Sequence, residues 1–177
     1  MYYQIKFHSD WHCGSGLASG ADVDALVVKD SNGLPYIPGK TIKGLIREAF
    51  DELEKYGKNI NVSNSIFGTE GNEKGCLFFT NAEISEQERD YIVKNKLQRF
   101  LYRTQSSTAI DDNGIAKKHS LRKIETVVPC TLEGEIKGVA DDKELKDGLK
   151  NAMKYIKRLG QNRNRGLGRC SIIFKED

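Results

Sequence analysis

The sequence predicts an α+β fold in which a ferredoxin-like (RRM-like) antiparallel sheet carries helices on one face and a β-hairpin protrudes. The expected elements follow one another as strand, helix, strand and again strand, helix, strand, which is the ferredoxin-like order. A polar stretch with a central turn interrupts that order at 104–123. Because neither a repeat period nor a linker-like stretch is present, we expect one domain over 1–177, with the hairpin inserted at about 104–123.

The first strand and the first helix have the clearest patterns. Tyr3, Ile5 and Phe7 alternate with polar residues, as in a half-buried strand. An extended segment is expected over 23–29, followed by a turn. A helix then begins at Pro38-Gly39, with one apolar face and one basic face. The apolar face consists of Ile42, Leu45, Ile46, Ala49, Phe50 and Leu53, and the basic face of Lys40, Lys43 and Arg47.

A second strand, a second helix and the hairpin are expected in the middle of the chain. The strand is predicted over 75–84. The capping box of Ser85 and Glu88 begins a helix that we expect to end near Tyr102. The hairpin follows, with Asp111-Asp112-Asn113-Gly114 at its turn.

The C-terminal part is predicted to repeat the strand, helix, strand order. A strand is expected over 126–139, and Asp141 and Asp142 precede a helix whose C-terminal cap is expected at Gly160. The apolar face of that helix consists of Leu145, Leu149, Met153 and Ile156, and the last strand alternates at Cys170, Ile172 and Phe174.

Composition limits the class of protein. Hydrophobic residues make up 38% of the chain and charged residues 30%, a balance typical of globular proteins. No apolar run approaches the ~20 residues of a membrane span, and residues 1–10 do not resemble a signal peptide, so a cytoplasmic location is expected.

The cysteines, at 13, 76, 130 and 170, are too far apart for the pairs of a zinc site and are expected to be reduced thiols.

Positive charge is concentrated in Gly160-Gln-Asn-Arg-Asn-Arg-Gly-Leu-Gly-Arg169. Glycines allow backbone N–H groups to approach a phosphate, and arginines add charge and forked donors. The net charge is only +3, so this clustering says more about partners than the total does. We interpret the segment as a phosphate-binding loop, and the alternative is a solvated basic turn.

Two other segments contain parts of nucleotide-binding motifs without their spacing. Gly39-Lys40-Thr41 lacks the first glycine of a phosphate loop, because position 34 is leucine. The segment can still be interpreted as a helix N-terminus near lysines, which suits an anion. An interpretation as a solvated helix face is equally supported. The stretch from Gly14 to Gly20 has serine at 19, where a dinucleotide fingerprint needs glycine, so we interpret it as a flexible or close-packed loop.

Asp24 is the best candidate for catalysis. It lies near Asp22 and Asp30, between the glycine stretch and an extended segment. A carboxylate at such a place can hold a divalent metal or help to deprotonate a hydroxyl, and the alternative is a turn-forming residue. The three histidines, His8, His12 and His119, are interpreted as ordinary surface residues.

Four segments, taken together, carry a resemblance to a known family. They are Gly14-Ser-Gly16 with Asp24-Ala-Leu-Val-Val-Lys-Asp30, Leu34-Pro-Tyr-Ile-Pro-Gly-Lys-Thr-Ile-Lys-Gly-Leu-Ile-Arg47, Thr108 to Lys117 leading into Ser120 to Val128, and Leu159 to Arg169. In this order they resemble the backbone subunits of type III CRISPR effector complexes of the Csm and Cmr kind, within the repeat-associated (RAMP) superfamily. The second and fourth segments are typical of the superfamily, and the third, with Asp24, is typical of the backbone subunit.

The resemblance implies an RNA-binding subunit. Its partners would be a guide CRISPR RNA, a target RNA, copies of itself along the guide and other effector subunits, with no membrane involved. The hairpin would be a "thumb" that displaces bases at intervals, with Ile110 and Ile115 as wedge residues. Guide contacts would be to phosphate and sugar, which leaves the bases free to pair. The residues expected to bind RNA are Lys40, Lys43, Arg47, Arg122, Arg163, Arg165, Gly166, Gly168 and Arg169.

The resemblance also implies a reaction. Asp24 matches the catalytic aspartate of the family, and Asp22 is the fallback. The reaction would be cleavage of the target RNA by its own 2′-hydroxyl, with a divalent metal, Mg²⁺ or Mn²⁺, held at Asp24. Two alternatives remain. One is a non-catalytic structural subunit of the same assembly. The other is a metal-independent, guide-processing endoribonuclease that uses His12 or His119.

Overall fold

A four-stranded antiparallel sheet forms the centre of the computed structural model, which describes residues 1–18, 22–56, 66–68, 75–139 and 142–175. Gly20 and Asp141, selected from the sequence, lie outside these residues. The strand order is β2-β5-β1-β6, which together with two helices on one face confirms the predicted ferredoxin-like fold class. The strands are β1 (Tyr2–Phe7), β2 (Phe78–Phe79), β5 (Thr131–Lys137) and β6 (Cys170–Lys175).

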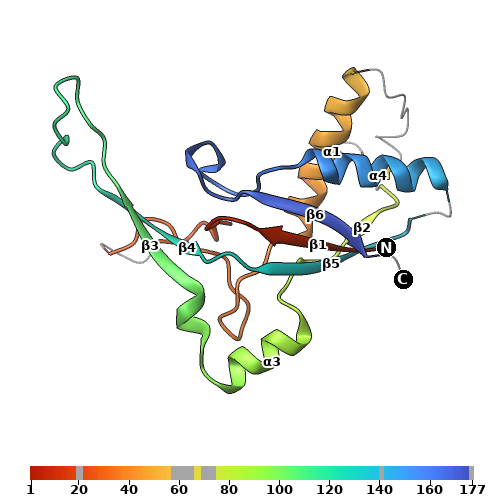
Figure 1. Ribbon diagram of the computed structural model, residues 1–177, viewed down its shortest axis with the longest axis horizontal. Helices are drawn as coiled ribbons and strands as arrows, with labels where there is room; N and C mark the ends of the chain where they lie inside the picture. The colour runs from red at the N-terminus through yellow and green to blue at the C-terminus, as the bar shows by residue number, and fades with distance from the viewer. Residues whose placement is uncertain (19–21, 57–65, 69–74, 140–141, 176–177) are drawn as a thin grey trace.

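Two helices cover one face of the sheet (Figure 1). They are α1 (Gly39–Lys55) and α4 (Lys143–Tyr155), which contact each other as well as β2 and β6 respectively. Ile5 of β1 aligns with Leu132 of β5 and Ile172 of β6, so one buried row crosses three strands. The apolar faces predicted for both helices point into this core, where Phe50 and Leu149 are fully buried. None of the described helices is long and apolar enough to cross a membrane.

The predicted hairpin is confirmed as a separate two-stranded sheet that projects away from the rest of the molecule (Figure 1). Its strands are β3 (Tyr102–Ser107) and β4 (Arg122–Val127), with Tyr102 aligned to Val127 at the base. Beyond the ladder, Ser120 Oγ is 2.7 Å from Thr108 Oγ1 and donates to the Lys117 carbonyl at 2.7 Å. These side-chain bonds lie between the β3–β4 ladder and the antiparallel bridge of Ile110 with Ala116 near the tip, so the two arms stay paired along the projection.

Two predictions about the helices were wrong. The second helix, expected to reach Tyr102, is α3 (Glu86–Lys94), capped as predicted by Ser85, whose hydroxyl accepts the Glu88 N–H. It stops because Lys96 adopts a positive φ of 54°, and a short 3₁₀ helix, η1 (Gln98–Leu101), leads into β3. Gly160 does not cap α4, because that helix ends at Tyr155.

The predicted strands were also too long. The segment 126–139 divides between the hairpin and the main sheet at Pro129, which has no N–H to donate. In 75–84 only Phe78–Phe79 form a ladder, and Ala82 and Glu83 add isolated bridges. The extended segment at 23–29 likewise pairs only through isolated bridges.

Candidate nucleic-acid interface

The segment after β1 and the arginine–glycine loop at 160–169 lie against each other. The Gln161 N–H donates to the His12 carbonyl at 2.9 Å, and the Gly168 N–H donates to the Asp10 carbonyl at 2.8 Å. These bonds join residues that are far apart in sequence. They fix the loop on the chain just beyond β1. The segment after β1, which contains Gly14 and Gly16, and the loop at 160–169 are the two glycine segments, and together they form one surface.

Glycine is required at two positions of the loop. Gly160 has a φ of +96°, and an ideal Cβ there would lie 2.4 Å from the His12 carbonyl oxygen. Gly168 has a φ of +69°, and its Cβ would lie 1.9 Å from the Leu159 carbonyl oxygen. Gly166 also has a positive φ, of +95°, but its surroundings are open. Gly160 and Gly168 therefore allow close packing of the backbone. For Gly160, this packing replaces the predicted role as a helix cap.

The arginines of the loop face solvent. Arg163, Arg165 and Arg169 are exposed, and the first two belong to a short 3₁₀ turn, η2 (Arg163–Arg165). Arg158 donates from Nη1 to the Arg163 carbonyl at 2.6 Å, which braces that turn. Within the described part of the chain none of the three arginines forms an ion pair. The loop therefore presents uncompensated positive charge, which suits a polyanion.

Two backbone donors at the N-terminus of α1, those of Gly39 and Thr41, are occupied. The Gly39 N–H donates to Asn81 Oδ1 at 3.0 Å and the Thr41 N–H to the Pro38 carbonyl at 2.9 Å. A Cβ on Gly39 would lie 2.1 Å from the Phe79 carbonyl oxygen, so this glycine serves packing against β2. These two N–H groups are therefore not available to an anion, whereas the basic side chains of the helix can contact one. Lys40 is exposed, and Lys43 and Arg47 are half-buried.

Two isoleucines are exposed at the tip of the hairpin. Asp111 shapes the tip, because its Oδ1 accepts the N–H groups of Asn113 at 3.0 Å and Ile115 at 2.8 Å. Ile110 is 63% exposed and Ile115 is 65% exposed. Leu121, at 60% exposure, lies closer to β4 and was not selected from the sequence. Exposed apolar side chains on a projection indicate a contact surface.

Asp24 is held beside β4, near the end of the β3–β4 ladder that leads to the hairpin tip. Its N–H donates to the Lys123 carbonyl at 2.8 Å, and its Oδ2 accepts the Lys123 N–H at 2.7 Å. Ala25 forms a parallel bridge with Ile124, and Arg122 is exposed at the start of β4. Asp24 is thus an exposed carboxylate fixed on the hairpin and not a loose turn residue.

The other acidic candidates have different surroundings. Asp30 closes its own turn, since its Oδ1 accepts the N–H groups of Asn32 at 2.9 Å and Leu34 at 2.8 Å, whereas Asp22 is exposed. Among the described residues, no group of three or more His, Cys, Asp or Glu side chains is placed to hold a metal. Mg²⁺ in proteins is commonly bound through one or two carboxylates, with water and phosphate oxygens completing the shell. Asp24 therefore fits a metal only if nucleic acid supplies further ligands.

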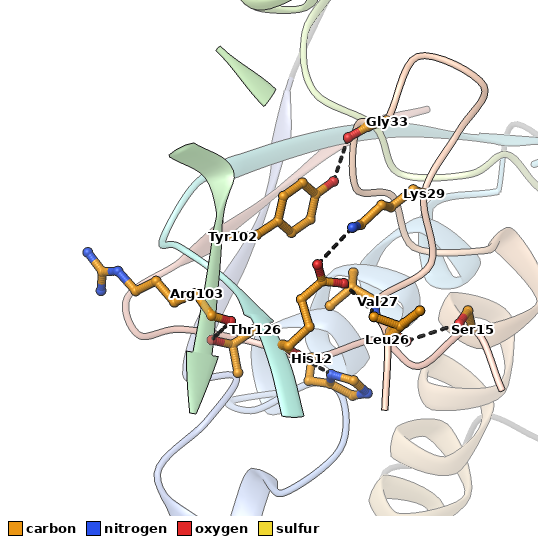
Figure 2. A network of polar contacts seen from close by, with 10 residues as sticks. His12, Ser15, Leu26, Val27, Lys29, Gly33, Tyr102, Arg103 and Thr126 are labelled. Carbon is orange, nitrogen blue, oxygen red and sulfur yellow. Dashed lines mark hydrogen bonds and ion pairs between the residues drawn. The ribbon is translucent and has the colours of Figure 1, made fainter. Parts of the chain in front are cut away.

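His12 is buried, so its interpretation as a surface residue was wrong. Its ring is 0% exposed, and Nδ1 lies 2.6 Å from the Glu125 carbonyl oxygen (Figure 2). A carbonyl can only accept, so Nδ1 carries the proton. The Glu125 carboxylate accepts from Lys29 Nζ at 2.7 Å and from the Val27 N–H at 3.1 Å. His8 and His119 are exposed, as predicted.

A polar network joins the segment before α1 to the base of the hairpin (Figure 2). Lys29 Nζ lies 4.0 Å from the centre of the Tyr102 ring, and the Tyr102 hydroxyl donates to the Gly33 carbonyl at 2.7 Å. Burial, with nearby negative charge from Glu125 and Asp30, raises the pKa of Tyr102, so the hydroxyl remains a neutral donor. Sequence reasoning missed Glu125, Lys29 and Tyr102, because their contacts join distant segments and leave no local pattern.

The fold and this surface define a class of protein, ferredoxin-like (RRM-like) α+β proteins that present a basic glycine loop and a projecting hairpin. Residues 4–171 match the RAMP superfamily, and the chain belongs to that superfamily.

Solved structures support the same fold. A chain of a type III-B Cmr-β complex bound to cognate target RNA is 12% identical, with a TM-score of 0.73 over 97% of this chain and 95% of that one. A chain of the apo state of type III-B Cmr-β is 13% identical, with a TM-score of 0.72 over 99% and 97%. No curated protein matches the sequence significantly.

Proposed function

We propose that this chain is a guide-RNA-binding backbone subunit of a type III CRISPR effector complex that cleaves complementary target RNA. Several copies would line the guide, together with other effector subunits. Membership of the RAMP superfamily and the similarity in fold to chains of Cmr-β complexes support this assignment. The exposed and unpaired arginines of the 160–169 loop suit the phosphates of the guide.

One observation carries the catalytic part of the proposal. Asp24 is fixed by two hydrogen bonds to Lys123, near the outer end of the β3–β4 ladder of a hairpin whose tip exposes Ile110 and Ile115. A hairpin that inserts apolar side chains between bases unstacks them, and an unstacked nucleotide places its 2′-hydroxyl and the next phosphate within reach of a carboxylate. Asp24 would accept or orient the proton of that hydroxyl as it attacks the phosphorus.

A divalent metal, Mg²⁺ or Mn²⁺, is part of the proposal. Asp24 would be its protein ligand, and RNA oxygens and water would complete its coordination, because no group of three or more possible side-chain ligands is found among the described residues. When bound, the metal would stabilise negative charge on the phosphate.

A non-catalytic, structural RNA-binding subunit of the same assembly is the second candidate. The observation that favours it is that no group of three or more His, Cys, Asp or Glu side chains among the described residues is placed to hold a metal. A guide-processing endoribonuclease is a weaker candidate, because His12 is fully buried and general acid–base catalysis needs direct reach to the substrate, which leaves the exposed His119 as the one histidine of the two that could serve it.

The experiment uses the full chain assembled on a guide RNA, with a labelled complementary target and either Mg²⁺ or EDTA. We expect cleavage that EDTA abolishes and that Asp24→Asn lowers at least ~100-fold, the usual scale for loss of a general base. Asp24→Asn keeps the side-chain acceptor for Lys123, and Asp22→Asn is the matched control, expected to cleave normally. Target binding without any cleavage by the wild type would leave the structural candidate, and metal-independent cleavage of a guide precursor would support the processing enzyme.

A further inference from the structure

A buried acceptor lies under the surface formed by the two glycine segments. His12 Nδ1 is committed to the Glu125 carbonyl, so in the neutral ring Nε2 carries a lone pair. Nε2 is buried and has no hydrogen-bond partner among the described residues. An unpaired buried polar atom costs about 1–3 kcal/mol, so a native structure that keeps one calls for an explanation.

The atoms around Nε2 define where a ligand would approach. A Cβ built on Gly14 would lie 3.2 Å from His12 Nε2 and 2.9 Å from Gln161 Nε2. The space over Gly14 is therefore bordered by an acceptor on one side and an amide donor on the other. Gln161 is exposed, and its side chain makes no hydrogen bond within the described residues. Rotation of the exposed Gln161 side chain would widen the space over Gly14, and such rotamer changes are fast.

The chemistry of the space selects its ligand. A phosphate has no proton to give, so a neutral Nε2 cannot bond to it. A ribose 2′-hydroxyl is both donor and acceptor. It can donate to His12 Nε2 and accept from Gln161 Nε2, which uses both atoms at once.

We propose that His12, Gly14 and Gln161 form a binding site for a ribose 2′-hydroxyl, through which this chain distinguishes RNA from related polyanions. The site lies next to the arginines that suit phosphates, on the same loop. It rests on the proposed function, since a guide RNA would supply the ribose. Phosphate contacts alone would bind any nucleic acid, and this site adds the selectivity for RNA that the arginines lack.

The test compares the affinity of the full chain for a single-stranded RNA and for the same sequence in 2′-fluoro form, which removes the hydroxyl donor. His12→Asn keeps a donor that can reach the Glu125 carbonyl and deletes the Nε2 acceptor, and Gly14→Ala fills the space without requiring a positive φ. The wild type should prefer RNA, and each variant should lose about three- to tenfold of that preference, as for one hydrogen bond.

Tyr3→Phe is the matched control. Tyr3 is another fully buried residue whose polar atom has no partner, and it lies in β1 against Gly134 of β5. This variant should keep the wild-type preference for RNA. Thermal unfolding of each variant checks that it is folded, and Gly14→Ala keeps the test decisive if His12→Asn does not fold.

Four outcomes overturn the inference. Equal affinity of the wild type for the two oligonucleotides, or an unchanged preference in folded variants, excludes a 2′-hydroxyl site while leaving the proposed function intact. Equal loss of affinity for both oligonucleotides in His12→Asn and Gly14→Ala indicates a phosphate contact instead. Failure of the wild type to bind either oligonucleotide overturns the proposed function as well.

Discussion

At the residue scale, burial controls the ionisable groups of the core. It raises the pKa of Tyr3, and it raises the pKa of the Cys130 and Cys170 thiols to about 11. These groups are neutral in the folded protein, and their neutral forms are favoured there because the charged forms are poorly solvated. These groups ionise more easily in the unfolded chain, so the free energy of unfolding decreases at alkaline pH.

The free energy of unfolding should therefore be level near neutral pH and should fall as pH rises. Above the unfolded thiol pKa of about 8.5 the unfolded chain binds fewer protons than the native one, so the slope is negative through about pH 11. Urea unfolding at several pH values under reducing conditions measures this. A Cys170→Ala variant should show a shallower fall than the wild type, and an identical slope would contradict the assignment to Cys170.

At the scale of the element, the arginine–glycine loop depends on backbone packing. Gly168 combines a positive φ with a carbonyl 1.9 Å from its ideal Cβ position, whereas Gly166 has a positive φ and open surroundings. Substitution at Gly166 therefore measures the cost of backbone strain alone, and substitution at Gly168 measures the cost of strain together with steric contact. A residue in the left-handed region costs about 1–3 kcal/mol when its side chain is not glycine.

Gly168→Ala should therefore destabilise the protein more than Gly166→Ala does. We expect about 1 kcal/mol for Gly166→Ala and at least ~2 kcal/mol more for Gly168→Ala, because the second variant must also move the Leu159 backbone. Denaturant unfolding of both variants gives the comparison. Equal destabilisation would show that the close approach at Gly168 relaxes at no cost.

At the scale of the whole molecule, the segment between β1 and α1 links every part of the proposed site. Asp10 and His12 hold the arginine loop, and Asp24 and Lys29 bond to residues of β4 in the hairpin. Acidic side chains collect elsewhere, around the hollows that Glu133 borders. The small net charge of +3 thus conceals a local basic surface.

Removal of two arginines from that surface should weaken the salt dependence of RNA binding. Each phosphate contact on a single strand contributes about 0.7 to the slope of log affinity against log salt, so Arg163→Ala with Arg165→Ala should lower it by ~1.4. Lys55→Ala is the control, because Lys55 is paired with Glu52 at 2.8 Å at the end of α1. A slope that stays at the wild-type value in the double variant would place the guide on another surface.

The strands and helices of the core could be predicted because their patterns are local. The alternation at Tyr3, Ile5 and Phe7 marks β1, and the apolar face of α1 follows helical spacing. The end of α3 could not be predicted. Leu97 and Phe100 continue the helical spacing beyond Lys94, while the break depends on the positive φ of Lys96.

The candidate site was predictable only in its residue types. The arginine loop and Asp24 stood out through composition and resemblance, but their surroundings depend on long-range contacts. The bond between Asp24 and Lys123 joins residues 99 positions apart, and that between His12 and Glu125 joins residues 113 apart. No spacing rule reaches so far, which is why the burial of His12 was missed.

In the proposed assembly, copies of this chain line a guide RNA and displace its bases with the hairpin tip. Chemical probing of the guide bases in the assembled particle tests this arrangement. We predict reactive, unstacked bases at constant spacing, and loss of this pattern with retained RNA binding in a double variant, Ile110→Ser with Ile115→Ser. Because both side chains are exposed, the fold should tolerate the change. Uniform protection of the guide, or an unchanged pattern in the double variant, would contradict this arrangement.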